Sequence, residues 1–210
     1  MANTLSNLIT EFLEYCEIER GLSQRTVRNY SHYLNRFVDW EKISKAEQIT
    51  ADRVRQYRLK LNRFENTKGE PLKKQTQAYH LIAIRAFLKY LAKRDIKTLA
   101  AEKIELPKTS GRQVEFLTGD EVEKLLKQPD AKDMSGLRDR AIFELLFSTG
   151  LRISELTNLN IDQVNLKNDS FSVRGKGDKV RVVFLSERAR DTLKKYLHER
   201  RDDAPALFIR

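Results

Sequence analysis

The spacing of apolar residues changes character along this chain of 210 residues, and that change divides it in two. Helical spacing persists through the first hundred residues and then fades between about positions 97 and 116. Inside that stretch, residues 106–112 read Leu-Pro-Lys-Thr-Ser-Gly-Arg, a short, polar and basic segment typical of an interdomain linker. We therefore predict one domain at 1–100, a linker at 101–116 and a second domain at 117–210.

The first domain is predicted to contain helices only. Apolar stripes span residues 5–20, from about 23 to 40, 51–64 and from about 74 to 94. Gly21 ends the first stripe, and Ser23 and Thr50 are suited to cap the second and third helices. Residues 66–71 contain glycine and proline and are interpreted as a loop. The pattern predicts a four-helix domain.

The second domain is predicted to combine helices with one β-hairpin. Thr118 and Glu121 have the spacing of a capping box at a helix start, and a strongly apolar helix follows at 137–147 before a turn at Gly150. Polar and apolar residues alternate at 170–174 and 180–185, with Gly-Lys-Gly-Asp between them, which is typical of a hairpin. A last helix is expected at about 187–201. The whole chain is therefore predicted to be mainly α.

The charge of the chain favours a polyanionic partner. Lys and Arg outnumber Asp and Glu by 40 to 30, and the excess is spread along the sequence. This distribution suits a folded surface that follows nucleic acid, although ribosomal and membrane-surface proteins share a basic balance. Because no segment approaches the roughly 20 apolar residues of a membrane span, and the N-terminus lacks a signal-like core, we expect a cytoplasmic protein without a membrane partner.

Cysteine and histidine give no sign of a metal site. The single cysteine, Cys16, excludes an internal disulfide and a thiolate cluster, and its neighbours at helical spacing predict a buried thiol. The three histidines, His32, His80 and His198, lack the spacing of metal ligands. No metal site is predicted.

Arg152 is the first candidate for chemistry. It follows the glycine turn at 150 and begins a short helix, a position that favours an anion. A guanidinium can bind two phosphate oxygens at once and keeps its charge. Glu155 lies three residues later on the same face and can hold that guanidinium in place. The alternative is an ordinary surface ion pair between the two residues.

Lys176 is the second candidate. Glycines flank it at the tip of the predicted hairpin, where a lysine can reach into a groove and act as a general acid toward a leaving alkoxide. Arg174, Lys179 and Arg181 surround it with positive charge that attracts a phosphate backbone. The alternative is a hairpin tip that is charged only for solubility.

Three stretches carry a family resemblance: Thr149-Gly150-Leu151-Arg152 with Ser154-Glu155-Leu156 after it, Gly175-Lys176-Gly177 with Lys179 and Arg181, and residues 84–91 in the first domain. With them the chain resembles the tyrosine recombinase, or phage integrase, family, most closely its Xer-like branch. The resemblance covers the whole chain. It implies a SAM-like core-binding domain followed by the first part of an α+β catalytic domain.

The resemblance also implies a function. Members of this family cleave and rejoin DNA strands through a 3′-phosphotyrosine, without a metal or nucleotide cofactor, as tetramers assembled on double-stranded DNA. By position, Arg152 is similar to the first catalytic arginine, Lys176 to the hairpin lysine that protonates the 5′-oxygen, and Glu155 to the acidic residue that supports the arginine.

The chain departs from the family pattern beyond these motifs. The family continues with a His-x-x-Arg motif and a nucleophilic tyrosine, whereas the one tyrosine after Arg152 is Tyr196, which the helical spacing predicts to be core. We expect a truncated, catalytically incomplete protein that is monomeric off DNA. An exposed apolar end at Leu207, Phe208 and Ile209 is expected to mark the truncation.

Further DNA contacts are predicted in the first domain, where two helix starts are rich in hydroxyls, amides and cations. These residues are Ser23, Gln24, Thr26, Arg28, Lys73, Lys74, Gln75, Thr76 and Arg85. Tyr79 stands where relatives often have a basic residue. Each of these residues can instead be a cap or part of a solvated face. Two other functions stay open: a non-catalytic DNA-binding module or regulator, and a topoisomerase-like relative.

Overall fold

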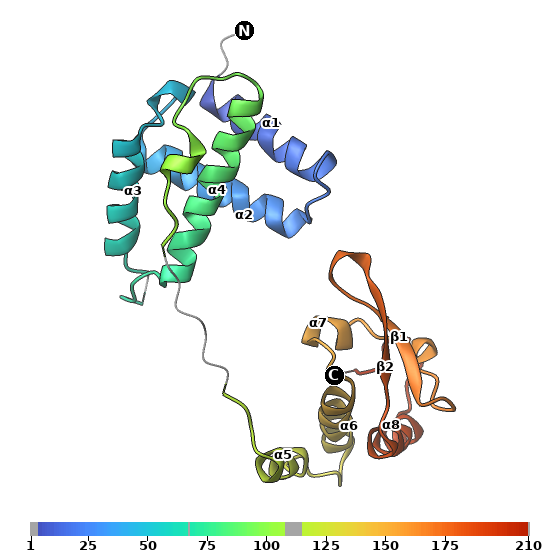
Figure 1. The fold of residues 1–210 in the computed structure, drawn as a ribbon. Helices are drawn as coiled ribbons and strands as arrows, with labels where there is room; N and C mark the ends of the chain where they lie inside the picture. The colour runs from blue at the N-terminus through green and yellow to red at the C-terminus, as the bar shows by residue number, and fades with distance from the viewer. Residues whose placement is uncertain (1–3, 67, 108–114, 210) are drawn as a thin grey trace. The chain divides into compact units, whose positions relative to one another are not determined.

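A computed structural model describes residues 4–66, 68–107 and 115–209, apart from the side chain of Lys176. The chain divides into two compact units, Met1–Arg112 and Gln113–Arg210 (Figure 1). The described residues are mainly helical and include one antiparallel pair of strands, which confirms the predicted fold class. The division between the units falls within the segment 101–116.

The first unit contains the four predicted helices, α1 (Leu5–Ile18), α2 (Gln24–Glu41), α3 (Ala51–Arg63) and α4 (Lys74–Lys93), with short 3-10 turns at Ala46–Gln48 and Ala101–Lys103. The hydroxyl oxygens of Ser23 and Thr50 accept hydrogen bonds from N–H groups three residues on, so both predicted caps are confirmed. Thr4 caps α1 in the same way. Local sequence therefore determines where these helices begin.

Helix α4 is central to the first core, because it packs on α1, α2 and α3 (Figure 1). Its buried residues recur at helical spacing and include Ile84, Phe87 and Leu91. Cys16 is buried in the same core, as predicted. Ala101 and Ile104 are buried there too, so the beginning of the 101–116 segment packs on the first unit.

One polar pair lies inside this apolar core. The hydroxyl of Tyr57 and Nδ1 of His80 are 2.7 Å apart, and both side chains are buried. Burial, with the nearby Arg36 and His32, lowers the pKa of His80 to about 4. His80 is therefore neutral at pH 7.

The second unit begins with α5 (Gly119–Leu126) and α6 (Met134–Thr149), followed by the four-residue α7 (Ile153–Leu156) and a 3-10 turn at Ile161–Gln163. Strands β1 (Ser170–Arg174) and β2 (Val180–Phe184) enclose a turn that includes the 3-10 segment Lys176–Asp178, and α8 (Glu187–Glu199) ends the series (Figure 1). The register pairs Ser170 with Phe184 and Arg174 with Val180. The predicted hairpin and the capping box of Thr118 and Glu121 are both confirmed.

Helix α6 begins three residues earlier than predicted. The carboxylate of Asp133 caps it by accepting the N–H of Gly136 at 2.7 Å. A Cβ on Gly136 would lie 1.6 Å from the carbonyl oxygen of Asp130, so only glycine fits at this close approach. Apolar spacing alone does not detect this start, because the first turn of α6 is built from a cap and a tight backbone contact.

The predicted exposure of the apolar run 207–209 is wrong. Leu207 is 0% exposed and Phe208 and Ile209 are half-buried. The N–H of Leu207 donates to the carbonyl of Leu159 at 2.7 Å, and the ring of Phe208 stacks on Tyr196. The partners that cover this run are 12 to 48 positions away, and apolar composition cannot reveal them. Because the run is covered, its apolar character is no evidence for the expected truncation.

Candidate functional site

The position of Arg152 is determined by the end of α6. Gly150 ends that helix with φ +60°, and its N–H donates to the carbonyl of Leu146 at 2.9 Å. A residue with a side chain is strained in this left-handed conformation, whereas glycine is not. Leu151 then turns into the core, and Arg152 has extended backbone at the start of α7. A glycine turn and a buried leucine thus direct Arg152 toward solvent.

Glu155 holds Arg152 at two points. Its Oε1 accepts from Nη1 of Arg152 and its Oε2 accepts from the backbone N–H of Arg152, each at 2.8 Å. The side chain of Glu155 is 6% exposed, whereas that of Arg152 is 62% exposed. The contact predicted from their spacing is present. It leaves most of the Arg152 guanidinium accessible while its backbone and one nitrogen are fixed.

Arg181, from β2, is a second partner of the same carboxylate. Its Nη1 donates to Oε1 of Glu155 at 2.8 Å and its Nη2 to Oε2 at 2.7 Å, a two-pronged pairing. These hydrogen bonds, followed by the one from the Arg152 backbone, hold the pKa of the Glu155 carboxyl well below its usual range. Glu155 is thus ionised at neutral pH between two cations. The pairing was not predicted, because sequence spacing gives no sign of it.

The hairpin turn is described only in part. Gly175 donates its N–H to the carbonyl of Lys179 at 2.8 Å, and Arg174 pairs with Asp178 at 2.5 Å. The side chain of Lys176 lies outside the described part of the chain. Convergence of Lys176 and Arg152 on one phosphate therefore stays a prediction.

A cavity of about 500 Å³ lies beside these groups. Its lining comes from α7, the segment after it, β1 and the hairpin turn, and includes Arg152, Ser154, Asn158, Ser172 and Arg174. The lining also includes the carboxylates of Glu155 and Asp178, which pair with Arg152 and Arg174. Because both carboxylates already have partners, the N–H groups that the two arginines keep free and the hydroxyl and amide groups can hydrogen-bond the oxygens of a phosphate.

The predicted residues of the first unit are all at its surface. Ser23 and Thr26 are joined by a hydrogen bond between their hydroxyls at 2.9 Å, and the amide of Gln24 bonds Glu17. Arg28, Lys73, Lys74 and Gln75 are exposed, and Thr26, Thr76 and Arg85 are half-buried. One set lies at the beginning of α2 and another at the beginning of α4, whereas Arg85 lies about three turns further along α4. Ser23 is thus a cap and a candidate contact at once.

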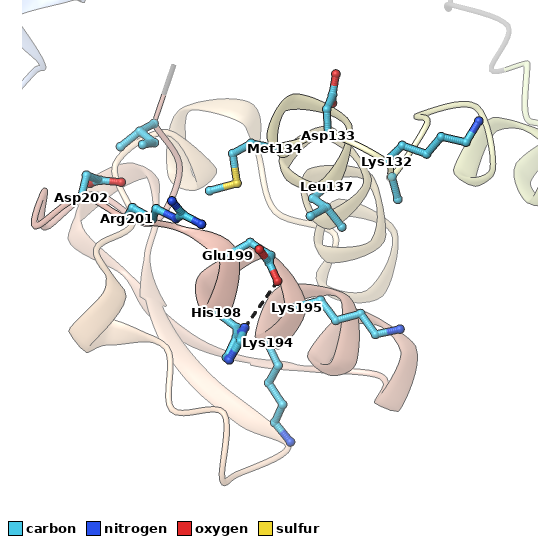
Figure 2. A pocket seen from close by; sticks show the side chains of 12 residues that line it. Lys132, Asp133, Met134, Leu137, Lys194, Lys195, His198, Glu199, Arg201 and Asp202 are labelled. Carbon is cyan, nitrogen blue, oxygen red and sulfur yellow. Dashed lines mark ion pairs between the residues drawn. The ribbon is translucent and has the colours of Figure 1, made fainter.

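A larger cavity, of about 1110 Å³, lies elsewhere in the second unit, and none of the predicted residues lines it. It lies between the beginning of α6 and the end of α8 and is lined by Met134, Leu137 and charged residues of both signs (Figure 2). Lys194 and Lys195 extend in different directions, and His198 faces Glu199 (Figure 2). No set of like charges converges there, so we do not assign this cavity a phosphate.

Two kinds of feature are absent from the described ranges. Among residues 4–66, 68–107 and 115–209, no helix has the length and apolar character needed to cross a membrane. In the same ranges, no three His, Cys, Asp or Glu residues gather as metal ligands do.

Comparison with protein families assigns both halves of the chain. Residues 9–95 match the N-terminal SAM-like domain of phage integrases, and residues 115–210 match the phage integrase family. The tyrosine recombinase XerD of Lacticaseibacillus casei is 36% identical over 199 residues, which cover 94% of this chain and 66% of that protein. The tyrosine recombinase XerC of Pelobacter propionicus is 36% identical over 93% of this chain and 65% of its own length. The chain thus spans just under two thirds of the length of these relatives.

Solved structures share the fold at lower identity. The Tn1549 transposon integrase in complex with circular intermediate DNA aligns with a TM-score of 0.69 at 16% identity, over 96% of this chain and 71% of that chain. A lambda integrase tetramer bound to a Holliday junction aligns with a TM-score of 0.67 at 19% identity, over 92% of this chain and 56% of that chain. Both alignments support the observed fold.

Proposed function

This chain belongs to the phage integrase family of tyrosine recombinases, and we propose on that basis that it binds double-stranded DNA with Arg152 on a backbone phosphate. The observation that carries the proposal is the cluster of Arg152, Glu155 and Arg181. A guanidinium that is already fixed loses less conformational entropy when it binds an anion. Its 62% exposure leaves it accessible to a phosphate.

In the whole protein, we assign to this site a part in strand cleavage and rejoining through a 3′-phosphotyrosine. Arg152 would stabilise the negative charge that develops on the phosphate. Lys176 would donate a proton to the leaving 5′-oxygen. Tyr196 is not a nucleophile for this reaction, because it is buried and its hydroxyl accepts the N–H of Ile209 at 3.3 Å. The 210 residues by themselves are expected to bind DNA without cleaving it.

The DNA surface we propose extends beyond Arg152 in both units. In the second unit it includes Arg174 and Lys179, which flank the hairpin turn. In the first unit it consists of Ser23, Gln24, Thr26, Arg28, Lys73, Lys74, Gln75, Thr76 and Arg85. The net charge of +10 supports contact with a polyanion.

We further propose that the protein acts in the cytoplasm and assembles with other recombinase protomers on DNA. The relatives that support this assembly are recombinases by name, and one solved neighbour is a tetramer bound to a Holliday junction.

A second candidate function is that of a DNA-binding regulator without catalysis. The fixed and exposed guanidinium of Arg152 is compatible with it, because holding a phosphate requires no nucleophile. Fusing the C-terminal segment of a Xer relative to this chain distinguishes the two functions. Cleavage of a nicked or suicide duplex by such a fusion, lost in R152A, supports the enzyme, and a covalently inert fusion supports the regulator.

The test of DNA binding is a titration of duplex DNA at several salt concentrations. For R152A we expect about a three- to tenfold loss of affinity and a salt slope lower by about one, because one phosphate contact is removed. The matched control is K194A, which removes one exposed cation outside the proposed surface. An affinity that does not change with salt contradicts DNA binding, and equal losses for R152A and K194A contradict the assigned phosphate contact.

A further inference from the structure

The Glu155 carboxylate has no acceptor position left for another partner. A carboxylate offers about four lone-pair sites, and Glu155 receives four hydrogen bonds. Arg152 supplies two of them, through Nη1 and the backbone N–H, and Arg181 supplies the other two. Each oxygen therefore accepts one bond from each arginine, and the orientation of the carboxylate depends on both.

Arg181 is the less accessible of the two arginines, and both of its terminal nitrogens are used. Its side chain is 36% exposed, against 62% for Arg152. The carboxylate takes two of the five N–H donors of Arg181, and the lower exposure of this side chain makes the remaining three less accessible to a phosphate than those of Arg152. Its hydrogen bond is also the largest cause of the lowered pKa of Glu155. Arg181 is thus bound to the anion that holds Arg152.

The turn before Lys176 lies against the same ion cluster. Gly175 has φ −102° and ψ −165°, extended backbone that any residue adopts, so conformation does not require glycine here. A Cβ at this position would lie 3.0 Å from Oε1 of Glu155 and 3.2 Å from Nη1 of Arg181. Both distances are tighter than ordinary contacts, so a side chain at 175 would press on the pair. A side chain at 175 would therefore require the ends of Glu155 and Arg181 to move by a few tenths of an ångström.

We propose that Arg181 is a positioning residue that acts on DNA through Glu155 and Arg152, and that Gly175 provides the room for this arrangement. The proposal rests on the proposed function and deepens it. It replaces the direct DNA contact expected for Arg181 from its charge. It also joins β2, which carries Arg181, to α7, so that the hairpin and Arg152 are held in one arrangement.

A double-mutant cycle tests whether Arg181 acts through Arg152. Duplex affinity is measured for the unmodified chain, R181Q, R152A and R152A/R181Q. The matched control is R190Q, because Arg190 pairs with Asp169 just before β1 and does not contact Glu155. We expect R181Q to lower affinity about as much as R152A does, and to add nothing in the R152A background beyond the loss seen in R190Q. Independent, multiplying losses would overturn the proposal.

A second measurement needs no DNA. The N–H of Arg152 donates to Oε2 of Glu155, so its hydrogen exchange reports whether Glu155 keeps its place. We expect exchange at Arg152 to be at least about fivefold faster in R181Q and unchanged in R190Q. Unchanged exchange in R181Q overturns the positioning role. If R152A has no effect on DNA affinity but exchange still responds to R181Q, the phosphate contact fails while the positioning role stands.

Milder variants keep the test independent of folding. R181K retains the charge but cannot bridge both oxygens as a guanidinium does, so faster exchange at Arg152 is expected there as well. G175A is expected to speed the same exchange, whereas G177A, whose Cβ would meet nothing within 4 Å, is expected to leave it unchanged despite its strained φ of +73°. Equal effects of G175A and G177A would contradict the role assigned to Gly175.

Discussion

Two polar clusters, one in each unit, show how differently this chain uses polar side chains. In the first unit, Tyr57 and His80 form a neutral pair enclosed by an apolar core. In the second unit, Glu155 joins Arg152 and Arg181 in a charged cluster at the surface. The neutral pair is accessible to no ligand and serves the fold. The charged cluster leaves one guanidinium in solvent and can serve binding. The difference teaches that burial, more than residue type, separates a packing role from a binding role here.

The largest expected effect is the pH dependence of the first unit. The pKa of His80 is about 4 in the folded chain and near 6.5 when unfolded, so the unfolded state binds a proton first. The stabilisation that the neutral form provides is complete above about pH 6.5 and is lost as pH falls toward 4, by about 3 kcal/mol. Urea unfolding followed by the fluorescence of Trp40, the single tryptophan, measures it. In H80Q the dependence should largely disappear, and an unchanged pH profile would contradict this assignment.

A smaller effect is expected from removing one hydroxyl. Y57F leaves Nδ1 of buried His80 without its partner and should lower the free energy of unfolding by about 1–2 kcal/mol. The matched variant is Y196F in the second unit, where the hydroxyl accepts a long 3.3 Å bond from Ile209. Its cost should be less than about 1 kcal/mol. Denaturant unfolding measures the free energy of unfolding of both variants. A loss in Y196F that equals or exceeds the loss in Y57F would contradict the expected difference between the two hydroxyls.

The smallest expected effect is the response of the charged cluster to mild acid. Since the pKa of Glu155 is held below its usual range, its contribution is complete above about pH 4.5, the unfolded value, and is lost only below it. Between pH 7 and 5 the first unit should weaken while the Arg152 amide stays protected. Hydrogen exchange at pH 7 and pH 5, corrected for the intrinsic rate, tests this. Loss of that protection by pH 5 would show that Glu155 is not held as described.

Local signals predicted most of the fold. The caps at Ser23, Thr50 and Thr118 and the alternation on either side of the hairpin turn depend on residues only a few positions apart, and all are confirmed. The beginning of α6 was missed, because Asp133 and Gly136 mark it by a cap and a close backbone contact instead of an apolar stripe. Helix starts and turns can be predicted from sequence when the residues that form them are a few positions apart and make a known capping or turn pattern.

Contacts between distant positions were the part that sequence could not supply. Arg152 and Glu155 were paired correctly, since three positions make one helical turn. Arg181 is 26 positions from Glu155, and its charge predicted a phosphate contact as readily as a carboxylate one. The cover of Leu207 by the segment near Leu159 depends on tertiary packing in the same way. Charge and hydropathy give the kind of partner but not its identity.

The four hydrogen bonds on Glu155 limit the chemistry that this residue can perform. Its four lone-pair sites accept hydrogen bonds and the pKa of its carboxyl is lowered, so Glu155 cannot act as a general base that removes the proton of an attacking hydroxyl near neutral pH. General-base work at this site must therefore fall to another group or to solvent. Glu155 is instead an anion that stays ionised. It offsets the charge of one of the two arginines, so the cluster of Arg152, Glu155 and Arg181 has a net charge of about +1 with which to attract an anionic ligand.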